Sequence, residues 1–122
     1  AFAGCYALSS VTLPKKLTSI GEYAFCGCEA LKKISLPSKL ITLGSGAFAD
    51  CAALEKIEIP ESVTSLEAEV FSNCSAMTLI NIPKTVQYIE DTAFFGCDEL
   101  VIKAPKDSVA AEFAEENGFE LK

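Results

Sequence analysis

The sequence has no histidine, no tryptophan and no arginine. Histidine is the commonest general base and the commonest metal ligand, so its absence argues against an enzyme and against a metal centre. The ten basic residues are therefore all lysines, and seventeen acidic residues give a formal net charge of −7. Nucleic acids and anionic membrane surfaces bind through basic side chains, so neither is expected as a partner.

Long apolar runs are also missing. No run approaches the roughly 20 residues that a membrane-spanning helix needs, so we expect no membrane insertion in this segment. Half of the 122 residues are nevertheless hydrophobic. A chain of this length and composition can bury a sizeable core within one folded domain.

The sequence does contain one pattern repeated with a period of 23 residues. The aligned copies share A-F-x-x-C-x-x-L-x-x-I-x-L-P-x-x-L-x-x-I, and the last proline, Pro105, comes one residue early. This period lies in the range of leucine-rich repeats, in which each copy forms one turn of a solenoid and only stacking buries its apolar side. Two columns of identical residues result: Phe2, Phe25, Phe48, Phe71 and Phe94, and Cys5, Cys28, Cys51, Cys74 and Cys97.

Each copy contains a strand signature, as in "LKKISLP" and "LEKIEIP", where apolar and polar residues alternate before a proline. We predict a right-handed leucine-rich-repeat solenoid with a parallel β-sheet on one wall and short strands or 3₁₀ turns on the other. The expected inward-facing residues are Val11, Leu13, Ile34, Leu36, Ile57, Ile59, Ile80 and Ile82.

The last part of the chain abandons the repeat. We predict five repeats over residues 1–105, the last one shortened, and a C-terminal cap over residues 106–122 with a helix at about 108–117. Asp107 or Ser108 can cap the start of this helix and Gly118 can end it. The chain opens in the middle of a repeat, so we expect a fragment of a longer solenoid or a first turn that is left open.

The repeated pattern resembles the BspA-like leucine-rich repeats, also called the Treponema pallidum type, over residues 1 to about 105. Departures are mild: Val70 replaces Ala, and Met77 replaces Leu. The resemblance implies a bacterial surface or secreted protein whose relatives bind host proteins or other cells. It implies no catalytic residue and no cofactor.

The cysteine column raises the question of metal binding or disulfides. Successive strands are about 4.8 Å apart, so the column forms a line rather than the cluster that a zinc site requires. We therefore expect buried free thiols and no metal. Cys26 lies outside the column, at a variable position, and we expect it to be partly exposed and the most reactive thiol.

The outer face of the strand sheet is the candidate protein-contact surface. It is predicted to carry Ser10, Thr12, Lys33, Ser35, Lys56, Glu58, Leu79 and Asn81. Leu79 stands out because its equivalents are polar; it could anchor a partner, be exposed on its own, or be covered by the cap. Glu67, Glu69, Glu90 and Asp91 fall in equivalent loops, which a solvated edge explains better than a Ca²⁺ site.

Two functions follow from these observations. The first is a non-catalytic module, extracellular or on the cell surface, that binds a protein such as a host extracellular protein. The second is a rigid spacer or stalk within a larger surface protein. This alternative stays open because the outer columns are mostly polar and, apart from Leu79, lack the apolar anchors of a binding face.

Overall fold

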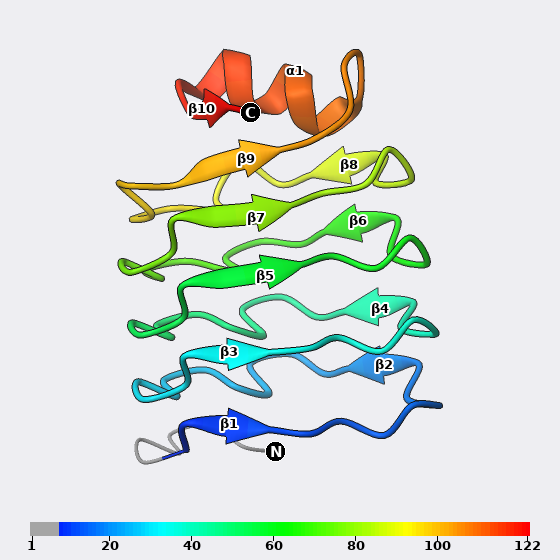
Figure 1. Ribbon diagram of the computed structural model, residues 1–122, viewed down its shortest axis with the longest axis vertical. Helices are drawn as coiled ribbons and strands as arrows, with labels where there is room; N and C mark the ends of the chain where they lie inside the picture. Colours follow the sequence, from blue (N-terminus) through cyan, green and yellow to red (C-terminus); the bar gives the residue numbers. More distant parts are fainter. Residues whose placement is uncertain (1–7) are drawn as a thin grey trace.

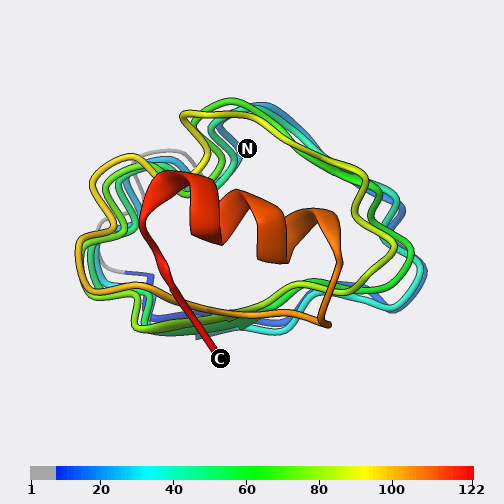
Figure 2. The ribbon, with the colours of Figure 1, turned by 90° about the horizontal axis from the view of Figure 1, so that it is seen from above.

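The computed structural model describes residues 8–122, so Phe2 and Cys5 lie outside the described residues. The chain climbs as a stack of similar turns and ends in a helix that covers the last turn (Figures 1 and 2). In Figure 1 the front strands run left to right and the back strands run right to left as the chain rises, which makes the coil right-handed. The solenoid and the C-terminal helix predicted from the sequence are thereby confirmed.

Two walls of short strands face each other across the core. The front strand wall consists of β1 (Ser10–Val11), β3 (Lys33–Ile34), β5 (Lys56–Glu58), β7 (Leu79–Asn81) and β9 (Val101–Lys103). The return wall consists of β2 (Ser19–Ile20), β4 (Thr42–Leu43), β6 (Ser65–Leu66) and β8 (Tyr88–Ile89). The return segments that could have been strands or 3₁₀ turns thus each contain a two-residue strand.

All strand pairs are parallel, and equivalent motif positions lie side by side. β1 pairs with β3, β5 with β7, β2 with β4, and β6 with β8. The shortened fifth copy keeps this order with a step of one residue less, because Val101 pairs with Leu79. The inward residues of β3, β5, β7 and β9 are buried, and Val11 in β1 is half-buried.

Proline begins the turn that joins the two walls. The backbone N–H three residues later donates to the proline carbonyl, at 3.1 Å in three copies and 3.3 Å in the fourth. Proline suits the start of such a turn because its φ is already fixed. The apolar residue that donates this hydrogen bond is buried at Leu40, Val63 and Val86, so each turn also places one side chain in the core.

At the opposite end, the chain turns inward at the A-F segment. The residue before each column cysteine has a positive φ: 77° at Gly27, 60° at Asp50, 60° at Asn73 and 84° at Gly96. Gly, Asn and Asp adopt this left-handed conformation most readily. The left-handed backbone at this position therefore favours Gly, Asn or Asp immediately before the cysteine.

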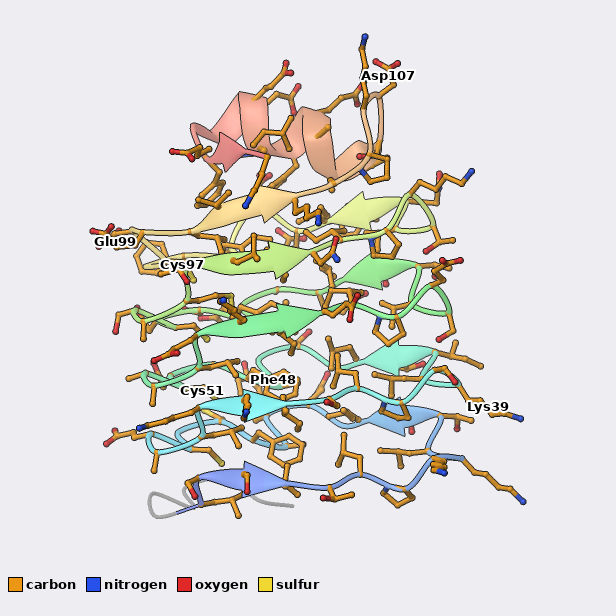
Figure 3. All side chains as sticks on the ribbon, viewed as in Figure 1. Lys39, Phe48, Cys51, Cys97, Glu99 and Asp107 are labelled. Carbon is orange, nitrogen blue, oxygen red and sulfur yellow. The ribbon has the colours of Figure 1, made fainter. Side chains whose placement is uncertain are left out.

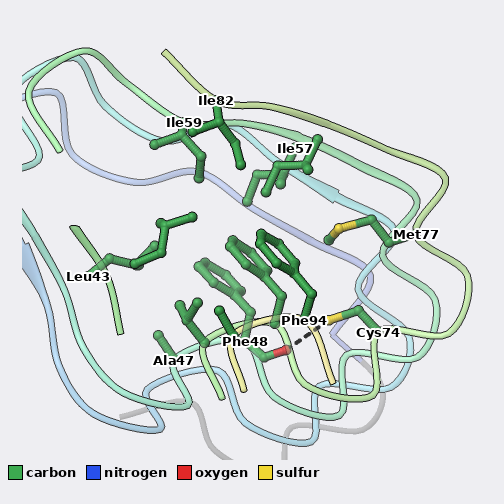
Figure 4. Close-up of a cluster of buried hydrophobic side chains, with 14 of the residues drawn as sticks. Leu43, Ala47, Phe48, Ile57, Ile59, Cys74, Met77, Ile82 and Phe94 are labelled. Carbon is green, nitrogen blue, oxygen red and sulfur yellow. Dashed lines mark hydrogen bonds between the residues drawn. The ribbon is translucent and has the colours of Figure 1, made fainter. Parts of the chain in front are cut away.

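Phenylalanine rings stack along the axis of the coil at this corner. The ring centroids of Phe25 and Phe48 are 5.3 Å apart, those of Phe48 and Phe71 5.6 Å, and those of Phe71 and Phe94 5.7 Å, with planes within 5° of parallel (Figure 4). The backbone holds them in register, because the N–H of Phe48 donates to the carbonyl of Val70 at 2.9 Å. All four rings are at least 98% buried.

The C-terminal segment closes this column. Helix α1 (Val109–Asn117) begins after Ser108, whose Oγ accepts from the N–H of Ala111 at 3.1 Å, and it ends at Gly118 with a φ of 77°. Its Phe113 ring packs against Phe94 at 5.9 Å, and Phe119 meets Phe94 edge-on at 6.0 Å. Strand β10 (Glu120–Leu121) then pairs with β9.

Replacing Phe48 with Ala is expected to lower the free energy of unfolding by about 3–5 kcal/mol, because the ring is fully buried between two others. Urea unfolding followed by circular dichroism measures this loss.

Ile41→Thr in the same turn is the matched control. Ile41 is 58% exposed, and Thr18 and Thr64 occupy its equivalent positions, so a change within about 0.5 kcal/mol is expected. Equal losses for the two variants would contradict the central role of the ring column.

Candidate functional site: the strand wall and the thiol column

The eight candidate contact residues lie on the strand wall with their side chains alternating with the buried ones. Six are exposed and two, Leu79 and Asn81, are half-buried. The registers place Lys33 beside Ser10, Leu79 beside Lys56, and Asn81 beside Glu58. Asn81 also donates from Nδ2 to the Glu58 carboxylate at 3.4 Å, a long hydrogen bond between successive turns.

Leu79 has an apolar neighbour that the sequence reading missed. Val101 in β9 pairs with Leu79, and Lys103 pairs with Asn81, so both belong to the outer columns. The cause of the omission is the residue lost from the fifth copy, which shifts these positions by one. Counting back from Pro105 instead of forward from Phe94 would have found them.

The outer face therefore has one pair of neighbouring apolar residues, Leu79 and Val101. Leu79 and Val101 are half-buried and adjacent, with Lys56 on one side and Glu120 on the other. A hollow lies beside β1 and β3 of the same wall, and Ser10, Thr12, Lys33 and Ser35 belong to its lining. This surface offers lysine ammonium groups, hydroxyls and one small apolar contact to a partner.

The column thiols have a more specific role than filling space. The thiol of each described column cysteine after Cys28 donates to the carbonyl of a phenylalanine in the turn before: Cys51 to Phe25 at 3.2 Å, Cys74 to Phe48 at 3.1 Å, and Cys97 to Phe71 at 3.1 Å (Figure 4). The same phenylalanine carbonyls accept the N–H of the cysteine in their own turn. Cysteine thus supplies a small side chain and a weak donor at a corner where the backbone turns.

The column thiols are shielded from solvent. The five cysteines of the described part of the chain form no disulfide, and the four in the column are buried. Burial raises the pKa of the Cys51 thiol from its ordinary value of 9.0 to about 12. Within residues 8–122, no group of three or more Cys, Asp or Glu side chains is arranged to hold a metal ion.

Cys26 is half-buried, and its surroundings make it a poor nucleophile. Desolvation, followed by the carboxylates of Asp50 and Glu69, raises the pKa of its thiol. A raised pKa lowers the fraction of reactive thiolate at neutral pH. The sequence around Cys26 predicts its exposure but not its acidic neighbours, because Asp50 and Glu69 come from the next two turns.

The acidic loops have partners of their own. Ser65 Oγ donates to the Glu67 carboxylate at 2.6 Å, and the Tyr88 hydroxyl donates to the Glu90 carboxylate at 2.5 Å. The hydrogen bond to Glu90 and the charge of that carboxylate raise the pKa of Tyr88. These loops form a negatively charged edge beside the return wall.

The geometry on both walls is that of a leucine-rich-repeat solenoid, and comparisons with known proteins identify the type. A BspA type leucine rich repeat region (6 copies) matches residues 1–111. The chain belongs to the BspA-type leucine-rich-repeat family. No curated protein sequence shows significant similarity to it.

Solved structures agree with this assignment. The chain is similar to a leucine rich cell surface protein of Faecalibacterium prausnitzii, with 34% identity and a TM-score of 0.86 over 92% of this chain and 30% of that one. A leucine rich repeat protein of T. pallidum matches with 37% identity and a TM-score of 0.82 over 86% of this chain and 50% of that one. A leucine-rich repeat protein from Bacteroides ovatus matches with 28% identity and a TM-score of 0.66 over 86% of this chain and 33% of that one. The chain thus spans half or less of the length of each of these structures.

Among the described cysteines, thiol labelling of the native protein is expected to modify Cys26 and to spare Cys28, Cys51, Cys74 and Cys97, because only Cys26 is accessible. Peptide mapping by mass spectrometry locates the label. The Asp50→Asn variant should label faster at Cys26, since one of the carboxylates that raise its pKa is gone. Rapid labelling of the column in the folded protein would contradict the buried thiol column.

Stability is expected to fall as the pH rises through the range between about 9 and 12. The folded state holds the Cys51 proton more tightly than the unfolded state does. The stabilisation of the folded state by this protonated thiol is therefore complete below pH 9, and it decreases as the thiol of the unfolded state ionises. At about pH 10 the loss should be about 1 kcal/mol. Urea unfolding across this range should show a shallower decline for Cys51→Ala, and identical slopes would contradict the assignment.

Proposed function

We propose that this chain is a non-catalytic protein-binding module of a bacterial cell-surface or secreted protein. The family and the similarity to a cell surface protein of F. prausnitzii support the location. Within residues 8–122, no helix is long and apolar enough to cross a membrane. The partner that the family resemblance favours is an extracellular protein of the host.

The observation that carries the proposal is the outer face of the strand wall. Each turn adds one step to two columns of outward side chains, held at fixed spacing by the parallel pairing of the strands. Such a rigid wall loses little conformational entropy on binding. The adjacent Leu79 and Val101 provide the apolar contact that a protein interface places at its centre.

A rigid spacer is the second candidate function, and the polarity of the rest of this face favours it. Apart from Leu79 and Val101, the outer columns contain Ser, Thr, Lys, Glu and Asn, whereas binding energy concentrates in aromatic and Arg anchors. A spacer needs the stack alone and makes no use of the Leu79–Val101 pair.

Leu79→Asp is expected to abolish retention of a host extracellular protein by the immobilised chain, because it places a charge in the apolar pair. The measurement is a pull-down from host extracellular proteins with both forms of the chain, analysed by mass spectrometry.

Ile41→Asp is the matched control. Ile41 is exposed on the return side of the solenoid, so its substitution tests a new charge away from the strand wall. Loss of the same retained protein in both variants would count against contact through the strand wall. No retained protein for the unmodified chain would favour the spacer.

A further inference from the structure

One side of the solenoid carries carboxylates and no lysine, whereas the strand and proline-turn side carries both, with Glu55, Glu58 and Glu61 among its lysines. The four return-and-corner segments, residues 18–30, 41–53, 64–76 and 87–99, contain no lysine. They contain nine acidic residues: Glu22, Glu29, Asp50, Glu67, Glu69, Glu90, Asp91, Asp98 and Glu99. Lys39 extends from the proline-turn end and Glu99 from the opposite end (Figure 3). The return-and-corner side of the molecule therefore carries only negative formal charges.

The same segments contain four of the five exposed large hydrophobic residues among those described. Tyr23, Ile41, Tyr88 and Phe95 are 46%, 58%, 52% and 68% exposed, and the fifth exposed large hydrophobic residue among those described, Leu121, lies in β10. Tyr23 has a packing role, because its ring lies against Gly46. A Cβ atom added to Gly46 would lie only 2.2 Å from Cε1 of the Tyr23 ring, so only glycine leaves room for it. Phe95 is the most exposed of the group.

The fold does not require an aromatic residue at position 95. The equivalent positions hold Cys26, Ala49 and Ser72, and Ala49 and Ser72 are buried. The backbone at Phe95 is nevertheless fixed, because its N–H donates to Thr92 at 3.1 Å and its carbonyl accepts from Asn73 at 2.6 Å. The ring is thus presented to solvent from a rigid corner.

Acidic side chains lie beside both exposed aromatic residues of the last turn. Asp91 and Asp98 line a hollow with Phe95, where the corner meets Gly118 and Phe119 of the cap. The charge of Asp91 also contributes to the raised pKa of Tyr88, whose hydroxyl donates to the Glu90 carboxylate. Tyr88, Glu90, Asp91, Phe95 and Asp98 are here called the Tyr88–Asp98 patch.

We propose that the Tyr88–Asp98 patch is a second docking surface, distinct from the strand wall, for a lysine- or arginine-rich segment of another protein. The carboxylates of Asp91 and Asp98 complement cationic side chains, and the aromatic faces accept both a cation and its aliphatic stem. A chain segment that combines basic and apolar residues satisfies both halves of the patch. This inference goes beyond the proposed function, because it assigns a different face and a defined partner chemistry.

The test is fluorescence anisotropy with a labelled peptide of alternating lysine and leucine, and with a glutamate–leucine peptide as the opposite-charge probe. The intact chain is expected to bind the lysine–leucine peptide and not the glutamate–leucine peptide. The affinity for the lysine–leucine peptide should weaken as NaCl is added. Phe95→Ser is expected to weaken this binding about tenfold, as for an aromatic anchor. Because Ser72 occupies the equivalent position, this variant should fold normally, which circular dichroism and urea unfolding check.

Ile41→Thr is the matched control, since it removes an exposed apolar side chain from the same side of an earlier turn and should leave the affinity unchanged. Leu79→Asp should also leave it unchanged, so failure of the strand-wall proposal and failure of this one are distinguishable. Equal binding of both peptides, or unchanged binding by Phe95→Ser, would overturn the proposal. Self-association in analytical ultracentrifugation that Phe95→Ser abolishes would also overturn it, and would assign the patch to a second copy of this chain.

Discussion

The repetition of one corner is the constraint on which the structure depends. At each described A-F corner, a phenylalanine ring, a cysteine thiol and a residue with left-handed backbone pack against the equivalent ring, thiol and left-handed residue of the neighbouring turn. The Cys74 thiol reaches the Phe48 carbonyl only because the two turns superimpose, and the stacked rings require the same alignment. A shift of one residue would separate all of these partners at once, so the 23-residue period is enforced by several short-range interactions together.

Once the corners are aligned, the two walls follow. Proline begins the far turn, and the parallel pairing sets the spacing of the outward residues. The stack still needs an end, because a repeat leaves one face of its core uncovered. The cap provides that end here by placing Phe113 of helix α1, and Phe119 just after the helix, on the last ring of the column. The cap thus continues the aromatic contacts while abandoning the repeat.

The distribution of charge follows from the same geometry. A repeat gives each sequence position its own stripe along the solenoid, so a bias at a few positions becomes a charged side of the molecule. Lysines and some carboxylates stand at the strand and proline-turn positions, whereas the return and corner positions contain carboxylates and no lysine. The constant spacing of the turns therefore gives one side of the molecule only acidic formal charges and leaves the other side with charges of both signs.

The period, the strand positions and the buried columns could be predicted from the sequence, because each copy independently repeats the same apolar and turn residues. The family followed from the same pattern and is shown by the comparison with known proteins. The Gly, Asp and Asn residues before the cysteines were also visible in the sequence, although their shared left-handed conformation became evident only from the backbone.

Other features depend on contacts between different turns, which no single copy contains. The register that sets Val101 beside Leu79, the acidic residues that raise the pKa of Cys26, and the exposure of Phe95 beside Asp91 are of this kind. The sequence alone determined which residues occupy each position of a turn, because local periodicity encodes that. Only the tertiary structure decided which side chains from neighbouring turns and from the cap meet, because those contacts form between residues about one repeat apart.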